Sequence, residues 1–212
     1  DDPNVRAQAI SALSSFQGSG EADRAIIEAL RDSVVSVRIA ASRAVAKRKL
    51  PEALPPLIYK ATNDPEKSVK TEAMRSIAEL GGGEGFSFLR RYLEEPKNDS
   101  SLRTLAFGLL LRKDPSGSLS LLKERLLKES QEKSRDFFTQ LAREVANASD
   151  APAAAPLARI LLSDSDYQIR LGGLEWARKT KAPEIKADLA ALADKDPSET
   201  IRKRAKDILA LY

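Results

Sequence analysis

The chain has 212 residues, of which 42% are hydrophobic and 31% charged, and 35 basic against 31 acidic side chains give it a net charge of +4. This balance excludes an intrinsically disordered chain and predicts only weak attraction to polyanions. Because the sequence contains neither cysteine nor histidine, disulfides, thiolate or imidazole metal ligands and histidine general bases are excluded. We therefore expect no metal and no cofactor. No stretch has the roughly 18 uninterrupted apolar residues of a membrane span.

One short pattern recurs along the whole chain: an apolar residue, then a basic one, then a small residue three positions after the basic one. In the first copy these residues are Val5, Arg6 and Ala9. The basic residue recurs at Arg6, Arg38, Lys70, Arg103, Arg135, Arg170 and Arg202. Successive copies are 32, 32, 33, 32, 35 and 32 residues apart. A fixed period in this range indicates a repeat array, in which each unit buries its apolar face against its neighbours.

Each repeat is predicted to contain two helices joined by a turn. The first helices are expected near 21–31, in the stretch that opens at 50–58, and near 85–95, 116–129, 152–163 and 183–194. The second helix of each repeat carries the basic residue, as over 68–80 in the third repeat. Prolines fall near the first-helix starts, where a missing N–H costs least. Glycines 81–83 follow the 68–80 helix and supply the left-handed conformation that ends helices.

An acidic residue precedes the basic one by six positions in five of the six repeats where that position can be read. These residues are Asp32, Asp64, Glu129, Asp164 and Asp196. A carboxylate there is expected to accept N–H groups at the start of the second helix and to pair with the basic residue of a neighbouring repeat. The predicted structural ladder consists of Asp32, Arg38, Asp64, Lys70, Asp164, Arg170, Asp196 and Arg202.

The turn-and-helix string 64–74 (DPEKSVKTEAM) and its counterpart 196–205 (DPSETIRKRA) resemble the HEAT repeat, in the HEAT-like form named after phycobilisome lyases. The resemblance covers the whole chain. It implies an all-α fold, a right-handed α-α superhelix or HEAT-like α-solenoid of about six and a half helix-pair repeats, as one domain over residues 1–212. In that family an aspartate–arginine ladder joins the repeats, and the second helices line the concave surface.

Two repeats depart from the pattern. Lys97 stands at the acidic position of the fourth repeat, and Ser134 and Phe138 replace the apolar and small residues of the fifth. We expect the ladder to break there. The pattern also begins in a second helix, so we expect further residues to precede the chain in the natural protein. A cytoplasmic location is favoured unless such an upstream segment directs the chain to the periplasm or to a lipid anchor.

The predicted partner-binding surface is the concave face of repeats four to six. The 102–111 helix has more apolar residues than one packed face can hide, and apolar residues of the next two repeats would extend its surplus into a strip. The strip is predicted to contain Leu105, Phe107, Leu111, Phe137, Leu171 and Trp176. Arg43 and Arg75 are also predicted partner-binding residues; they stand at the basic end of a concave row that becomes acidic at Glu175 and Asp207. The alternative is that the aromatics are core residues, as aromatics at helical spacing usually are.

These features favour a non-enzymatic scaffold that binds a protein or peptide on its concave face. One alternative is a nucleic-acid binder or a HEAT-like DNA glycosylase, in which Trp176 with Glu175 or Asp207 would act; the mixed charge of the groove disfavours nucleic acid. Another alternative is a bilin-lyase-like subunit. The hydroxylases built from this repeat use His–Glu metal motifs, which a chain without histidine cannot supply.

Overall fold

The structure is a computed structural model that describes residues 2–16, 20–148 and 152–212. Over these residues the regular structure consists of thirteen α-helices and three short 3-10 helices, without any strand. The chain divides into two compact units, residues 1–92 (unit 1) and 93–212 (unit 2). The division falls inside helix α6 (Gly82–Glu94). None of the helices in the described ranges is long and apolar enough to cross a membrane.

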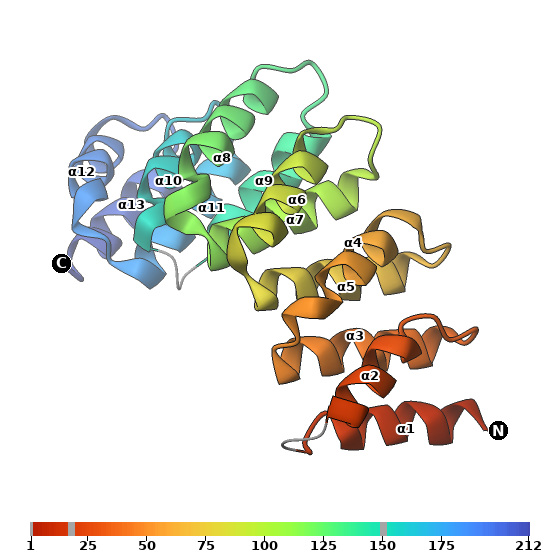
Figure 1. Ribbon diagram of the computed structural model, residues 1–212. Coiled ribbons are helices and arrows are strands. Elements are labelled where there is room, and N and C mark those ends of the chain that lie inside the picture. Colours follow the sequence, from red (N-terminus) through yellow and green to blue (C-terminus); the bar gives the residue numbers. More distant parts are fainter. Residues whose placement is uncertain (1, 17–19, 149–151) are drawn as a thin grey trace. The chain divides into compact units, whose positions relative to one another are not determined.

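Unit 1 contains two layers of helices (Figure 1). The second helices of its repeats are α1 (Pro3–Leu13), α3 (Val35–Arg48) and α5 (Lys67–Leu80). Its first helices are α2 (Gly20–Ala29) and α4 (Leu54–Asn63), with a 3-10 turn (Pro51–Ala53) before α4. Helix α3 packs between α1 and α5, while α2 and α4 cover α3 and α5 respectively. We call the uncovered side of the second helices the second-helix face.

Unit 2 repeats this arrangement with more helices (Figure 1). Its second helices are α7 (Ser100–Lys113), α9 (Asp136–Asn147), α11 (Tyr167–Thr180) and α13 (Glu199–Leu209). Its complete first helices are α8 (Pro115–Ser130), α10 (Ala155–Leu162) and α12 (Lys186–Lys195). Short 3-10 turns (Pro152–Ala154 and Pro183–Ile185) precede α10 and α12. Neighbouring second helices pack side by side, as do α8 with α10 and α10 with α12.

The repeat pattern predicted these elements closely. Helix α5 begins one residue before the expected 68–80 range and ends at Leu80 as expected. The first helix expected to open at residue 50 begins instead at Leu54 after a 3-10 turn. Gly81 and Gly82 have φ angles of 71° and 80°, positive values that favour glycine and let the chain leave α5 and begin α6 at once. Lys49 ends α3 in the left-handed αL conformation, with a φ angle of 57°.

The small residue of the pattern is needed because the two helices of a repeat approach closely. From the second copy onward the residue at this position is buried, including Phe138, which replaces the small residue in the fifth copy: Ala41, Ala73, Ala106, Phe138, Gly173 and Ala205. At Gly173 on α11, an added Cβ would come within 2.9 Å of the Leu162 side chain on α10. In the first copy the small residue, Ala9, is exposed, and the apolar residue of that copy, Val5, is 61% exposed. The all-α fold of about six and a half helix pairs is confirmed.

Candidate functional site

A buried ion pair joins two successive repeats of unit 1. Arg38 on α3 donates from Nε and Nη2 to both carboxylate oxygens of Asp64, each at 2.9 Å. Its Nη1 donates to the backbone carbonyls of Asp32 and Ser33, in the turn before α3, at 2.9 and 3.0 Å. The guanidinium therefore ties the turn of its own repeat to the turn of the next one, with the bidentate geometry that favours Arg over Lys.

The aspartates of the ladder also organise the turns that hold them. Asp64 accepts the backbone N–H of Glu66 at 3.1 Å, and Asp32 accepts that of Val34 at 2.8 Å. Burial opposes ionisation of Asp64, but hydrogen bonds from Arg38, Glu66 and Lys60 outweigh it and hold the pKa of Asp64 below its usual value. The same side chain thus closes the turn and receives the guanidinium.

The neighbouring ladder positions of unit 1 are bonded in two ways. Arg6 on α1 donates from Nε to Asp32 at 2.9 Å and from Nη2 at 3.1 Å, in a more exposed version of the Arg38 pair. The hydrogen bond from Arg6 lowers the pKa of Asp32. Lys70, a predicted ladder residue, donates instead to the Thr62 carbonyl at 2.9 Å, at the negative end of α4.

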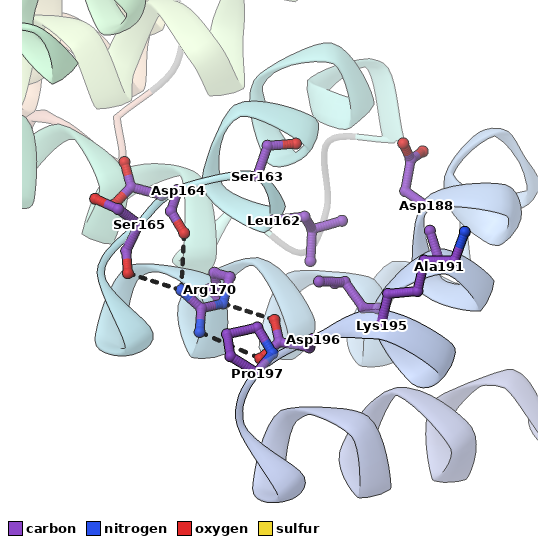
Figure 2. Close-up of a pocket in the computed structure, with 11 residues that line it drawn as sticks. Leu162, Ser163, Asp164, Ser165, Arg170, Asp188, Ala191, Lys195, Asp196 and Pro197 are labelled. Carbon is purple, nitrogen blue, oxygen red and sulfur yellow. Dashed lines mark hydrogen bonds and ion pairs between the residues drawn. The ribbon is translucent and has the colours of Figure 1, made fainter.

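In unit 2 the ladder borders a hollow of about 560 Å³ between the turn after α10 and the helix α12. Figure 2 shows Arg170 between the turn that contains Asp164 and the turn that contains Asp196. Arg170 Nε lies 2.8 Å from Asp196 Oδ2, and Nη1 donates to the carbonyls of Asp164 and Ser165 at 2.8 and 2.9 Å. Arg202 on α13 donates to the Asp196 carbonyl at 2.6 Å. We call this space the α10–α12 hollow.

The ladder changes character at Arg103 on α7. Its Nε donates to the Leu93 carbonyl at 2.8 Å, in the last turn of α6, and its guanidinium lies 4.3 Å above the Phe137 ring. Glu129 stands 26 residues after Arg103, as Asp64 does after Arg38, but its carboxylate pairs with Arg125 at 3.3 Å. Burial, with the nearby charge of Arg125, lowers the pKa of Arg103. The ladder thus breaks at Arg103 of the fourth repeat, where a buried cation stacks on an aromatic ring, but it does not break in the fifth repeat, where Arg135 pairs with Asp164 at 2.6 Å.

For three of its six residues, the predicted apolar strip of repeats four to six is wrong, because these side chains are not at the surface. Phe107, Leu111 and Trp176 are fully buried, so they belong to the core. Helix α7 is apolar on nearly all sides and packs against both α8 and α9, and a helix that is apolar all round is a buried helix. Trp176 is held inside by its Nε1, which donates to the Ala148 carbonyl at 3.1 Å.

The other three members of the strip are half-buried: Leu105, Phe137 and Leu171. Phe137 already has a function in the fold, since Arg103 stacks on its ring. With Phe107, Leu111 and Trp176 in the core, only these three half-buried members of the predicted strip are left at the surface of unit 2.

The second-helix face of unit 1 is polar and partly neutralised. Arg43 and Arg75, the two basic residues predicted for the partner site, are both exposed. Arg43 pairs with Glu72 on the next second helix at 3.0 Å. Arg75 has no ion-pair partner among the residues that the structure describes.

The second-helix face of unit 2 has paired charges along three helices. Arg112 on α7 pairs with Glu144 on α9 at 3.0 Å, and this pair lies across Gly108, where any Cβ would collide with the Glu144 carboxylate. On α11, Glu175 pairs with Arg178 at 2.8 Å, and Lys179 lies 3.4 Å from it. The hydrogen bond from Arg178 lowers the pKa of Glu175. Arg112, Arg178 and Lys179 are therefore already paired with carboxylates.

A groove of about 270 Å³ separates α9 from α11 on the second-helix face. Its walls include the small residues Ala142, Ala146 and Gly172, so the helices leave room for a side chain from outside. Arg143 is exposed at its rim and has no ion-pair partner in the described ranges. We call this space the α9–α11 groove. Sequence reasoning missed it, although the small residues on facing helices were a visible signal.

The described residues contain no cluster of three or more acidic side chains arranged to hold a metal ion. The polar groups in the α9–α11 groove are an arginine, an amide and a hydroxyl, from Arg143, Gln168 and Thr139. Such groups orient and hold a ligand, and none of them is an efficient general base at neutral pH. The arrangement therefore supports binding.

The chain was compared with protein families, with curated protein sequences and with solved structures. Residues 1–59 match the family model for HEAT repeats. No curated protein sequence matches the chain significantly.

Three solved structures illustrate the structural similarity. The Escherichia coli protein YibA has a TM-score of 0.56 at 15% identity, over 99% of this chain and 75% of that one. The CpcE–CpcF complex of the Nostoc phycocyanin lyase has a TM-score of 0.51 at 18% identity, over 100% of this chain and 90% of that one. An archaeal HEAT-like repeat protein from Thermococcus onnurineus has a TM-score of 0.48 at 15% identity, with coverage of 100% and 98%. At these identities, the first two similarities establish the fold alone.

Proposed function

We propose that this chain, whose residues 1–59 match the family model for HEAT repeats and whose fold is similar to that of repeat proteins of known structure, is a non-enzymatic scaffold that binds a protein or peptide partner on its second-helix face. The observation that carries the proposal is the α9–α11 groove, a hollow with small apolar walls and a free arginine at its rim. A repeat array provides a rigid, extended surface, and the side chains on that surface give it a function.

The size and lining of the groove favour a side chain of a partner over a free metabolite. Its volume of about 270 Å³ lies below the roughly 300–1,000 Å³ of pockets that enclose small ligands. A helix or extended segment laid on a helical surface inserts single anchor side chains into hollows of this kind. Arg143 at the rim of the groove would pair with a carboxylate of the partner, which favours a partner segment with an acidic residue next to the anchor side chain.

The charge pairs of the second-helix face favour protein over nucleic acid. Arg112 is paired with Glu144, and Arg178 with Glu175, so these cations are already neutralised where phosphates would lie. A surface that binds nucleic acid gains its affinity from cations that replace counterions. Paired side chains instead offer a partner both donors and acceptors in fixed positions.

Further contacts are proposed on the same face of each unit. In unit 1 the exposed Arg43 and Arg75 would bind acidic groups of the partner. In unit 2 the half-buried Leu105 and Leu171 would add apolar contact beside the groove. Phe107, Leu111 and Trp176 are fully buried and therefore do not belong to the proposed binding surface.

The proposal is tested by selecting peptides from a displayed random 12-residue library on the whole chain and measuring their affinities by fluorescence anisotropy. We expect Arg143→Glu to weaken the selected peptides at least tenfold, because it reverses the free charge at the groove. Gly172→Leu fills the groove and is expected to have a similar effect.

The matched control is Arg204→Glu, an exposed arginine on α13 that does not line the groove, and it is expected to change affinity less than twofold. Circular dichroism of each variant establishes that the helices remain. If the selected peptides bind Arg143→Glu and Gly172→Leu as tightly as the parent chain, the α9–α11 groove is not the binding site.

A further inference from the structure

Unit 2 contains a second hollow beside the turn after α10, next to the α10–α12 hollow of Figure 2. It has a volume of about 490 Å³ and lies between α8 and α10; we call it the α8–α10 hollow. Its apolar lining includes Leu127, Pro156 and Ile160. Leu127 is 39% exposed although it is a large apolar side chain. The hollow therefore offers apolar surface to a ligand outside the second-helix face.

The α8–α10 hollow and the α10–α12 hollow meet at the turn between α10 and α11. Both are lined by Ser163, Asp164 and Ser165. Since α10 packs between α8 and α12, and packed helices are about 8–10 Å apart, the two hollows form a track about 20 Å long. An extended peptide of about six residues covers that length.

The charges along this track have an excess of two cations. Five basic and three acidic side chains line it. Each of the three aspartates forms an ion pair with an arginine: Arg135 with Asp164 at 2.6 Å, Arg159 with Asp188 at 2.9 Å, and Arg170 with Asp196 at 2.8 Å.

The two remaining cations are lysines at opposite ends of the track. Lys123 on α8 borders one hollow and Lys195 on α12 borders the other. Both are exposed, and neither has an ion-pair partner among the residues described for unit 2. Their charges are therefore available to an anionic ligand.

We propose that this track, from Lys123 past Leu127 to Lys195, binds an acidic peptide segment that carries one large apolar side chain. The apolar side chain packs on Leu127 and Ile160, and carboxylates on either side of it pair with Lys123 and Lys195. The complementarity of charge and the apolar patch together select this ligand: carboxylates alone leave Leu127 exposed, and an apolar segment alone leaves the two lysines unpaired. The surface is separate from the α9–α11 groove.

The test uses the whole chain and a labelled eight-residue peptide with one leucine flanked by aspartates, with binding measured by fluorescence anisotropy. We expect saturable binding that weakens as salt is raised. Replacing the aspartates by asparagine, or the leucine by serine, is expected to weaken it at least tenfold. In the protein, Lys123→Glu and Leu127→Ser are each expected to weaken it about tenfold.

The matched control is Lys128→Glu, an exposed lysine on the same helix that lines neither hollow, with an expected change below threefold. Arg143→Glu is expected to leave this binding unchanged, so failure here and failure at the α9–α11 groove are distinguishable. Equal binding of the aspartate and asparagine peptides, or equal effects of Lys123→Glu and Lys128→Glu, overturns the proposal. Binding to phosphatidylserine vesicles that survives Leu127→Ser, without binding to the peptide, also overturns it and assigns the lysines to a lipid surface.

Discussion

Arg38 in unit 1 and Arg103 in unit 2 occupy the same position of the repeat and are buried to the same degree, with 6% and 8% of their surface exposed. Arg38 binds the carboxylate of Asp64 with two hydrogen bonds. Arg103 binds a backbone carbonyl and stacks on Phe137. Arg38 and Arg103 thus show two different ways to stabilise a buried cation at this position of the repeat, and only one of them uses a carboxylate.

The second way depends on helix α6. Leu93 lies in its last turn, where carbonyl groups lack intrahelical partners and form the negative end of the helix dipole. An aromatic face adds a weaker attraction for the guanidinium. Because none of these partners has a full charge, removing Arg103 leaves no buried anion behind.

The largest effect expected from this comparison is that of Arg38→Met. The substitution removes the bidentate guanidinium from the buried Asp64 and leaves Lys60, at 3.3 Å, as its one remaining cation among the described residues. Breaking a buried pair from one side costs about 3–5 kcal/mol, and Lys60 places the expected loss at about 3 kcal/mol. Urea denaturation followed by circular dichroism measures the loss of unfolding free energy. The double variant Arg38→Met with Asp64→Leu is expected to recover most of it. A double variant as unstable as the single one would show that the cost does not come from the orphaned carboxylate.

Arg103→Met is expected to cost less, about 1–2 kcal/mol, from the lost hydrogen bond to Leu93 and the lost stacking on Phe137. The methionine also avoids the desolvation of a buried charge. The same denaturation measurement applies, with Phe137→Leu as the companion variant that removes only the stacking. A loss as large as that of Arg38→Met would mean that the two positions are stabilised alike.

The ion pair of Asp64 also predicts a pH dependence. The folded-state pKa of Asp64 is lowered, so its contribution is fully present above the unfolded value of about 3.9 and is lost as the pH falls through the lower folded value. Unfolding free energies measured from pH 6 to pH 2 are therefore expected to fall below about pH 4. Asp64→Asn is expected to reduce that slope, whereas Arg103→Met leaves it unchanged. Parallel curves for Asp64→Asn and the parent chain would contradict the assignment.

The smallest effect is expected at Arg43, five residues after Arg38 on the same helix. Arg43 pairs with Glu72 at 3.0 Å, but its side chain is 67% exposed. Exposed pairs contribute little because solvent screens them, so Arg43→Ala is expected to cost less than about 0.5 kcal/mol. Thermal unfolding of this variant beside Arg38→Met separates the two roles. A cost above about 1 kcal/mol would show that the exposed pair contributes to the fold.

The sequence predicted helices better than it predicted surfaces. The helix expected over 68–80 is found at Lys67–Leu80, because the periodic apolar positions and the terminating Gly81 are local signals. Phe107 and Leu111 were expected on a surface, yet both are fully buried. The residue pattern of a single helix does not indicate which other helices cover it, and α8 and α9 both pack against α7.

The ladder residues were partly visible in the sequence. An aspartate six positions before an arginine indicated a pair between repeats, and Arg38 with Asp64 forms it. The spacing gave no sign that Arg38 also binds the carbonyls of its own turn. Nor did it indicate that Glu129 pairs with Arg125 in place of Arg103. Such choices depend on side-chain reach and on competing partners.

The sequence by itself determined the repeat period, the order of helices and the small residues where helices cross, because these depend on local spacing and on contacts that every repeat shares. Only the tertiary structure decided which residues are exposed and how each buried charge is stabilised. Burial depends on every helix that packs around a residue, and those helices come from distant parts of the chain. The α9–α11 groove and the track from Lys123 to Lys195 therefore emerged only once the helices were placed together.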